Sequence, residues 1–266
     1  MSRSVLYGTT PALWVDMPIA ADARRPMIPL ERMPVPDVLS CVEPFTAARP
    51  QEIEALAKSA VRFRKAASTV LIGEGHVPDG LYVVLRGRVN LVRMGDGGRD
   101  LILSTLGPGD VLGESCAFDQ SGMSTSAVAA TPVELLRVPA ETISAHVRRE
   151  PETMVRLVRL LSDKLRDIEN VASSLALHDV EERLRRTLIR LVRRQGRRAP
   201  AASGWILAPV PTQSELARMV GSCRETVSRT LSAMARNGLV SSSGRRMVLD
   251  ESLLSSETAE PEVAAA

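Results

Sequence analysis

The sequence is poor in aromatic residues, in cysteine and in long apolar runs. Aromatic residues make up only 3% of its 266 residues, which argues against the aromatic platforms on which single strands stack. Its three cysteines are scattered and lack C-x-x-C spacing, which excludes a disulfide scaffold and a four-cysteine cluster. No apolar run approaches the roughly 20 residues of a membrane helix, and the N-terminus lacks the apolar core of a signal peptide. We therefore expect a soluble, cytoplasmic protein.

Catalytic and metal-binding signatures are missing as well. The only histidines are His76, His146 and His178, and the sequence contains no Ser/His/Asp or Cys/His arrangement, Walker loop or metal-ligand spacing. We expect that the protein is not an enzyme and that it holds no metal and no cofactor.

Positive charge is concentrated in one part of the chain, although the net charge is only +3. Residues 178–250 contain fourteen arginines against six acidic residues, whereas residues 1–177 carry 20 basic and 21 acidic groups. A basic block beside a neutral body is typical of a module that binds a polyanion such as DNA.

Neither end of the chain has the apolar pattern of a segment that packs into a hydrophobic core. Residues 1–36 contain six prolines and no sustained periodicity, which predicts a flexible arm. Residues 251–266 form an acidic stretch that we expect to be disordered.

Residues 37–150 are expected to form a β-rich domain. From about Val61 to Val138 short β-type runs alternate with glycine-containing turns; the runs are TVLI, LYVVL, RVNLV, LILSTL, TSAVAA and VELLRV. Closely spaced strands of this kind predict an antiparallel β-roll resembling a jelly roll. The fold class of the whole chain is therefore α+β.

A long helix is predicted over residues 151–177, with Pro151 in its first turn. Its apolar residues alternate at steps of four and three, which is the pattern of a two-helix seam; they are Met154, Val158, Leu161, Leu165, Ile168, Ala172 and Leu175. The stripe is narrow and flanked by charge, which favours a parallel homodimer. The alternative is a helix that packs on its own core.

Residues 178–250 are expected to form a second domain, which begins with a helix from about Asp179 to Arg194 and a polar loop. Val180, Leu184, Leu188, Leu191 and Val192 mark the buried side of this helix. Eight arginines lie between positions 183 and 198, and they fit either a solvated face or contacts with phosphates.

The strongest local motif is PTQSELARMVGSCRETVSRTLSAMARNGLV. Thr212 with Glu215, and Ser222 with Glu225, each have the spacing of a capping box. Two helices are therefore expected to start near residues 213 and 223, with a tight turn at Gly221 between them. This arrangement predicts a helix-turn-helix whose second helix enters the major groove of DNA.

The second helix presents Arg224 and Glu225 in its first turn, and Arg229 one turn later. Arginine can donate two hydrogen bonds to guanine, and a carboxylate can accept one from cytosine. The alternative is that Glu225 only caps the helix and pairs with Arg229. Gln213, Cys223 and Thr226 are further candidates for DNA contact. The following LVSSSGRRMVLD is typical of a winged hairpin that holds Arg245 and Arg246 near phosphates.

The segment G-S-C-R-E-T-V-S-R at 221–229 resembles the recognition helix of the Crp/Fnr family of bacterial transcription regulators, and the resemblance extends over about residues 50–250. It implies that Arg224, Glu225 and Arg229 read bases in TGTGA-like half-sites of an inverted repeat. It also implies a homodimer on double-stranded DNA and, for an activator, contact with RNA polymerase.

The β-rich half resembles the cyclic-nucleotide-binding roll of that family, and G-P-G-D-V-L-G-E at 107–114 resembles the entry to its phosphate cassette. Gly113 and Glu114 match a Gly-Glu pair of cAMP-binding family members, in which the glutamate accepts a hydrogen bond from a ribose hydroxyl. The arginine that neutralises the cyclic phosphate is replaced by Met123, followed by Ser124. From Val111 to Leu136 the sequence has no Lys or Arg, which predicts a degenerate pocket.

We therefore expect a regulator that does not use cAMP. The sequence lacks the cysteine cluster that an iron–sulfur member of the family needs. We also do not expect its three histidines to serve as axial ligands of a haem. A regulator gated by another ligand, such as cyclic di-GMP, remains an alternative, and a cyclic-nucleotide-binding protein that does not act on DNA is an alternative of another class.

Overall fold

A computed structural model describes residues 28–95, 100–118, 121–199 and 204–255. Its contacts divide the chain into two compact units. Within the described residues, the larger unit contains residues 28–184 and 212–228, and the smaller one contains residues 185–211 and 229–255. Each unit is described by itself.

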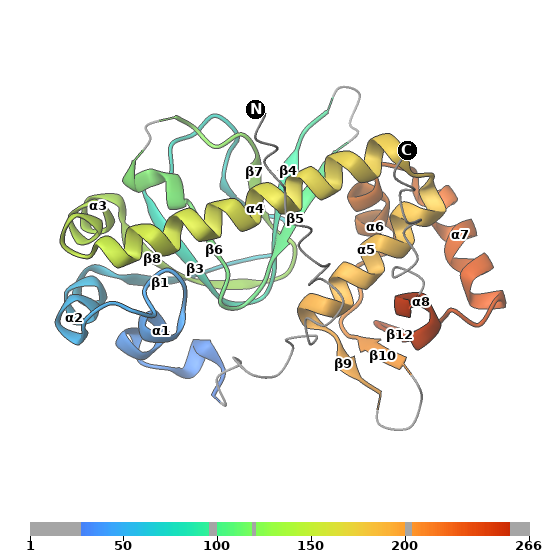
Figure 1. The fold of residues 1–266 in the computed structure, drawn as a ribbon, viewed down its shortest axis with the longest axis horizontal. Helices are drawn as coiled ribbons and strands as arrows, with labels where there is room; N and C mark the ends of the chain where they lie inside the picture. The colour runs from blue at the N-terminus through green and yellow to red at the C-terminus, as the bar shows by residue number, and fades with distance from the viewer. Residues whose placement is uncertain (1–27, 96–99, 119–120, 200–203, 256–266) are drawn as a thin grey trace, which may run out of the picture. The chain divides into compact units, whose positions relative to one another are not determined.

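The larger unit contains a β-roll of two four-stranded sheets (Figure 1). In sheet order, the first consists of β1 (Val61–Lys65), β8 (Val133–Pro139), β3 (Gly80–Arg86) and β6 (Val111–Leu112), and the second of β2 (Val70–Ile72), β7 (Ser126–Ala129), β4 (Val89–Arg93) and β5 (Leu101–Leu106). Neighbouring strands pair antiparallel. The predicted antiparallel roll is confirmed, and each of the six predicted runs contains a strand.

Strand β3 shows how the roll builds its core. All its residues from Gly80 to Leu85 are buried, and alternate side chains enter different hydrophobic clusters. Leu81 and Leu85 join the helices α1 (Val35–Cys41), α2 (Pro50–Ser59) and α3 (Ala140–Arg149), whereas Tyr82 and Val84 point between the sheets. The alternation follows from the two-residue period of a strand. It explains why β3 reads as a continuous apolar run.

The roll begins before residue 37, the boundary expected from the sequence. Leu30, in the short helix η1 (Leu30–Arg32), is buried in the same cluster as α1 and α2. The guanidinium of Arg62 donates to the carbonyl oxygens of Glu31 and Met33, which ties this segment to β1. Residues 1–27 of the expected arm lie outside the described residues.

A polar network joins α2 and α3 to the first turn of the next helix, α4 (Pro151–Leu177). The fully buried His146 contacts the Glu52 carboxylate through Nδ1 at 3.2 Å and the Thr153 hydroxyl through Nε2 at 3.1 Å. The Arg149 guanidinium donates hydrogen bonds of 3.1 Å to the Glu52 carboxylate. These bonds are the main cause that lowers the pKa of Glu52, and the hydrogen bond with His146 lowers it further. The network fixes where α4 starts.

Helix α4 spans Pro151–Leu177, as predicted, and it runs along the roll (Figure 1). Thr153, Leu157 and Val171 form its buried side. Five of the predicted seam residues remain exposed in the single chain; they are Met154 (37%), Val158 (53%), Leu161 (38%), Leu165 (60%) and Ile168 (38%). Ala172 is also exposed and Leu175 is half-buried. The helix therefore keeps an apolar stripe that its own roll does not cover.

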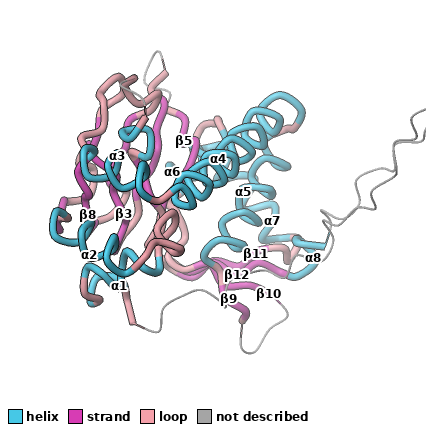
Figure 2. Tube along the Cα trace, turned by 60° about the vertical axis from the view of Figure 1, so that its left-hand side comes forward, coloured by secondary structure: helices cyan, strands magenta, loops and turns pink. Residues whose placement is uncertain are grey.

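The smaller unit is built on the four-stranded antiparallel sheet β11-β12-β10-β9 (Figure 2). Its strands are β9 (Arg197–Arg198), β10 (Gly204–Leu207), β11 (Val240–Ser243) and β12 (Arg246–Asp250). The polar loop predicted after the second helix therefore contains strand β9. Arg198 pairs with Glu251 at 3.3 Å and lies over the Trp205 ring. One of the eight arginines between positions 183 and 198 therefore makes contacts within its own unit.

Two helices flank this sheet in the chain. Helix α5 spans Val180–Gln195, close to the predicted bounds, and Leu184, Leu188, Leu191 and Val192 are buried as expected. At the other end, Glu251–Ser255 form α8, in which Leu253 is buried. This part of the predicted acidic tail is thus ordered, and residues 256–266 lie outside the described residues.

Candidate functional site

Helix α6 (Gln213–Val220) begins with the predicted capping box. The Thr212 hydroxyl accepts from the Glu215 amide at 3.2 Å, and the Glu215 carboxylate accepts from the Thr212 amide at 2.7 Å. Each bond satisfies a donor that a helix N-terminus otherwise leaves unpaired. The sequence therefore fixes the start of the first helix of the motif.

A sharp turn separates α6 from α7 (Arg224–Arg236). Gly221 has φ 60° and ψ 47°, a left-handed conformation that glycine adopts without strain and that ends helices. The second capping box, predicted between Ser222 and Glu225, is wrong by one residue. Because α7 begins at Arg224, Cys223 occupies the cap position, and its thiol contacts the Thr226 hydroxyl at 3.1 Å.

Most apolar residues of the motif are buried, and most of the polar candidates stay accessible. Those buried are Leu216, Met219, Val220, Val227 and Met234, whereas Leu231 is half-buried. Arg224, Glu225 and Arg229 are exposed, and so are Gln213 and Cys223. Thr226 is half-buried. Glu225 and Arg229 are four residues apart, so they lie one turn apart on the same face of α7.

Local contacts keep Glu225 ionised. A hydrogen bond from its own backbone amide is the largest cause that lowers the pKa of Glu225, followed by one from the Cys223 thiol. The nearby charge of Arg224 acts in the same direction. Capping and base reading are compatible, because a carboxylate has two oxygens and about four lone-pair sites. The residue thus retains acceptor capacity for a cytosine amino group.

The predicted wing is present as the hairpin of β11 and β12, which turns at Gly244 with φ 58°. Arg245 and Arg246 are both exposed at this turn. The carbonyl of Arg245 accepts from the amide of Val210 at 2.9 Å, which holds the hairpin tip to the segment before α6. Two guanidinium groups at such a tip are suited to phosphate contact.

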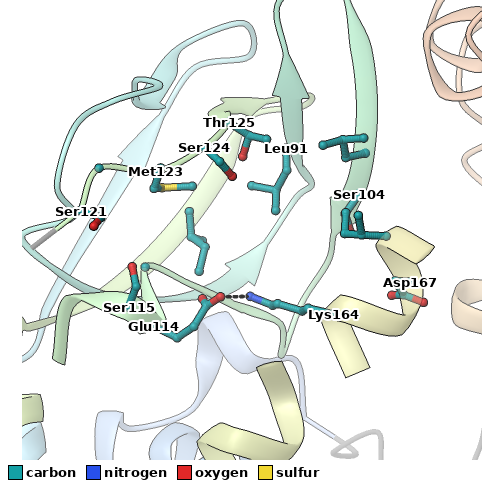
Figure 3. Close-up of a pocket in the computed structure, with 15 residues that line it drawn as sticks. Leu91, Ser104, Glu114, Ser115, Ser121, Met123, Ser124, Thr125, Lys164 and Asp167 are labelled. Carbon is teal, nitrogen blue, oxygen red and sulfur yellow. Dashed lines mark ion pairs between the residues drawn. The ribbon is translucent and has the colours of Figure 1, made fainter. Parts of the chain in front are cut away.

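A cavity of about 410 Å³ lies between the roll and α4 (Figure 3). The residues that line it are Leu91, Leu103, Ser104, Leu112, Gly113, Glu114, Ser115, Ser121, Gly122, Met123, Ser124, Thr125, Lys164, Asp167 and Ile168. All four residues assigned to the degenerate pocket are therefore brought together. Ile168 belongs both to this lining and to the apolar stripe of α4.

The expectation that the pocket lacks a cation needs correction. Lys164, from α4, places its Nζ 2.8 Å from Oε1 of Glu114, in helix η3 (Glu114–Ala117), and donates to the carbonyl of Val111 at 3.0 Å (Figure 3). The sequence stretch 111–136 contains no Lys or Arg, but the fold supplies one from elsewhere. Sequence reasoning missed Lys164 and Asp167 as lining residues of this pocket.

Met123 stands at the wall of the cavity with its backbone fixed by the turn at residues 73–76. Its amide donates to the His76 carbonyl at 3.0 Å, and its carbonyl accepts from the Gly75 amide at 2.8 Å. The half-buried Met123 side chain packs against the core between the sheets. The site of the expected phosphate contact is thus an ordered apolar wall.

Comparison with known proteins agrees with both halves of this description. Residues 62–150 match the profile of the cyclic nucleotide-binding domain, and residues 182–256 match that of the Crp-like helix-turn-helix domain. The chain is 36% identical over 169 residues to the cyclic AMP receptor protein of Thermus thermophilus, which covers 63% of this chain and 73% of that protein. The chain belongs to the Crp/Fnr family of transcription regulators.

Two further relatives extend the likeness over most of the chain. The CRP-like cAMP-activated global transcriptional regulator of Mycobacterium tuberculosis is 28% identical over 216 residues, which cover 81% of this chain and 96% of the relative. The solved structure of the c-di-GMP responsive global regulator CLP of Xanthomonas campestris is 29% identical, with a TM-score of 0.62, and covers 76% of this chain and 99% of that one.

Membership in the family establishes a DNA-binding transcription regulator rather than an enzyme. Within the described residues, no group of three His, Cys, Asp or Glu side chains is placed to hold a metal ion. None of the helices in the described part of the chain has the length and apolar character needed to cross a membrane.

Proposed function

We propose that this Crp/Fnr regulator acts in the cytoplasm as a homodimer that reads a TGTGA-like inverted repeat without requiring cAMP. The observation that carries the proposal is the exposed set Arg224, Glu225 and Arg229 on α7, which follows a capped helix and a glycine turn. Gln213, Cys223 and Thr226 add contacts near the start of each helix, and Arg245 and Arg246 hold phosphates. An activator would in addition contact RNA polymerase.

The exposed stripe of α4 supports the homodimer. Val158 and Leu165 are 53% and 60% exposed in the single chain, and both lie on the heptad pattern. Pairing two such helices removes their apolar side chains from water. A dimer also matches a palindromic site, whose half-sites lie about 34 Å apart, one turn of DNA.

The proposed independence from cAMP is supported by the contacts of two side chains. Met123 occupies the position of the family's phosphate-binding arginine, and Lys164 is engaged by Glu114 and the Val111 carbonyl. A buried phosphodiester would thus have no uncommitted cation among the described lining residues. Two relatives are named for cAMP, and analogy with them would favour cAMP as the ligand of this chain as well. The proposal departs from that analogy because of the contacts of Met123 and Lys164.

A second candidate is a regulator gated by cyclic di-GMP. It is favoured by the likeness to the structure of the c-di-GMP responsive global regulator CLP. The same experiment separates the two candidates.

The experiment is a titration of nucleotide-free protein into a labelled duplex with a TGTGA inverted repeat, followed by fluorescence anisotropy. The salt concentration is fixed because phosphate contacts make affinity salt-dependent, and a scrambled duplex is the control. Parallel samples contain cAMP or cyclic di-GMP. Selective binding without nucleotide supports the proposal. Binding that needs cAMP overturns the independence from cAMP, and binding that needs cyclic di-GMP establishes the second candidate.

A further inference from the structure

The cavity between the roll and α4 has the chemistry of a site for an uncharged, mostly apolar molecule. We propose that it binds a ligand of this class, bearing at least one hydroxyl or N–H donor, and that it rejects anions. The inference rests on the proposed function only in assigning this ligand to a regulator, since binding itself is measured without DNA.

The charges of the lining argue against an anion. Its ionisable residues within the described chain are Glu114, Lys164 and Asp167, which sum to one negative charge. Lys164 is already neutralised by Glu114 at 2.8 Å and donates to Val111. An entering anion would meet the Asp167 charge and would have to break this pair to gain a cation, which leaves the mostly buried Glu114 carboxylate uncompensated.

Arg93 lies outside the lining but contacts the cavity wall at Ser124. It donates to the Ser124 carbonyl at 2.6 Å and pairs with Glu74 at 2.8 Å, and its side chain is 55% exposed. Since its guanidinium is held at the surface by these two partners, it does not change the charge balance inside.

The walls favour an apolar ligand with a polar group at one end. Five large apolar side chains line the cavity; they are Leu91, Leu103, Leu112, Met123 and Ile168. Apolar surface of a ligand that they cover is removed from water, which is favourable in proportion to its area. A volume of about 410 Å³ lies within the range of ordinary small-molecule sites.

The lining also offers polar groups to a ligand. Five of the lining residues carry hydroxyls; they are Ser104, Ser115, Ser121, Ser124 and Thr125. A hydroxyl can both donate and accept a hydrogen bond. A hydroxyl or N–H group of an uncharged ligand can therefore bond to the lining without disturbing the pair of Lys164 and Glu114.

Two probes with the same ring skeleton test the preference. N-phenyl-1-naphthylamine is uncharged and has one N–H donor, and 8-anilinonaphthalene-1-sulfonate adds a single sulfonate. Full-length protein is titrated with each probe, and fluorescence gives the Kd. We expect the uncharged probe to bind at least about tenfold more tightly, which corresponds to about 1.4 kcal/mol.

Substitutions locate the probe. Ser104→Trp fills the cavity from β5 and should abolish binding of the uncharged probe, with circular dichroism as a check of folding. Met123→Arg puts a cation at the wall and should cancel most of the preference, raising the affinity for the sulfonate about tenfold. Met123→Gln, of similar length but uncharged, is the matched control and should give no such gain.

Three results would overturn the inference. They are equal or tighter binding of the sulfonate by the natural protein, no binding of the uncharged probe up to its solubility limit, and full retention of that probe by a folded Ser104→Trp variant, which would place it on the α4 stripe. None of them depends on the DNA titration. A failure of the ligand site is therefore distinguishable from a failure of the proposed DNA recognition.

Discussion

Lys164 and Glu114 form an ion pair, with 2.8 Å between Nζ and Oε1, that joins α4 to the roll. The two side chains are only 28% and 14% exposed. Since α4 also carries the apolar stripe proposed for the dimer, this pair links the cavity wall to the helix on which a partner chain would pack. A ligand in the cavity would touch both elements.

The first prediction concerns the energy of this pair. Lys164→Met should lower the free energy of unfolding by about 1–3 kcal/mol, because it leaves a mostly buried carboxylate without its partner. The double variant with Glu114→Gln should lose less than the sum of the two single variants. Urea unfolding of the four proteins gives the coupling energy.

The matched control lies on the same helix. Arg166 and Asp163 also form an ion pair, but their side chains are 58% and 71% exposed. Arg166→Met should change stability by less than about 0.5 kcal/mol, because exposed pairs contribute little. Equal losses of unfolding free energy for Lys164→Met and Arg166→Met would contradict the larger contribution to stability predicted for the pair of Lys164 and Glu114.

The second prediction is a pH dependence that originates at Glu52. Arg149 and His146 lower the pKa of Glu52 below its usual value near 4.5 in the folded protein. The carboxylate therefore contributes stability above pH 4.5, and this contribution is lost as the pH falls through the folded pKa. The stability advantage of the natural protein over Glu52→Gln should shrink between pH 6 and pH 3 in urea titrations.

Arg149 provides the test of the cause. Its hydrogen bonds are the largest influence on Glu52, so Arg149→Met should reduce the slope of stability against pH in the acid range. A slope unchanged in both variants would assign the acid sensitivity to other carboxylates.

Much of the fold could be predicted from local patterns. The heptad spacing and Pro151 define α4, and the Thr212–Glu215 box defines the start of α6. The helices α1, α2 and α3 were not predicted, because their short apolar faces resemble those of irregular segments until they pack on the roll. Strand β9 was missed because two exposed arginines give no strand signal without the pairing to β10.

The candidate sites divide in the same way. The placement of Arg224, Glu225 and Arg229 together on the exposed side of α7 could be predicted because the three residues are local to one helix. The error at Ser222 arose because a capping box fits a neighbouring register almost equally well. The pair of Lys164 with Glu114 could not be predicted, since no local pattern links an α4 lysine to a roll turn far earlier in the chain.

The third prediction tests the proposed dimer. Leu161→Glu should give monomers, because it places a charge in the middle of the apolar stripe, where pairing would bury it. Arg159→Glu, at an exposed position outside the stripe, is the control and should leave the dimer intact. Light scattering measures the mass of each. A dimeric mass for Leu161→Glu would rule out this stripe as the interface.

The fourth prediction tests base reading by α7. Arg224→Ala should remove the preference for guanine at one position of each half-site, a loss of about 1–3 kcal/mol in discrimination, while phosphate contacts keep general affinity for DNA. Arg236→Ala, at the other end of the same helix and also exposed, is the control and should keep the sequence preference.

Selection of binding sites from a random pool, with both variants at one salt concentration, reads out this difference directly. A reader of bases changes the selected sequence, whereas a phosphate contact changes only the affinity and its dependence on salt. If Arg224→Ala selects the same site as the natural protein with uniformly weaker binding, Arg224 contacts the DNA backbone, and Glu225 and Arg229 must carry the specificity.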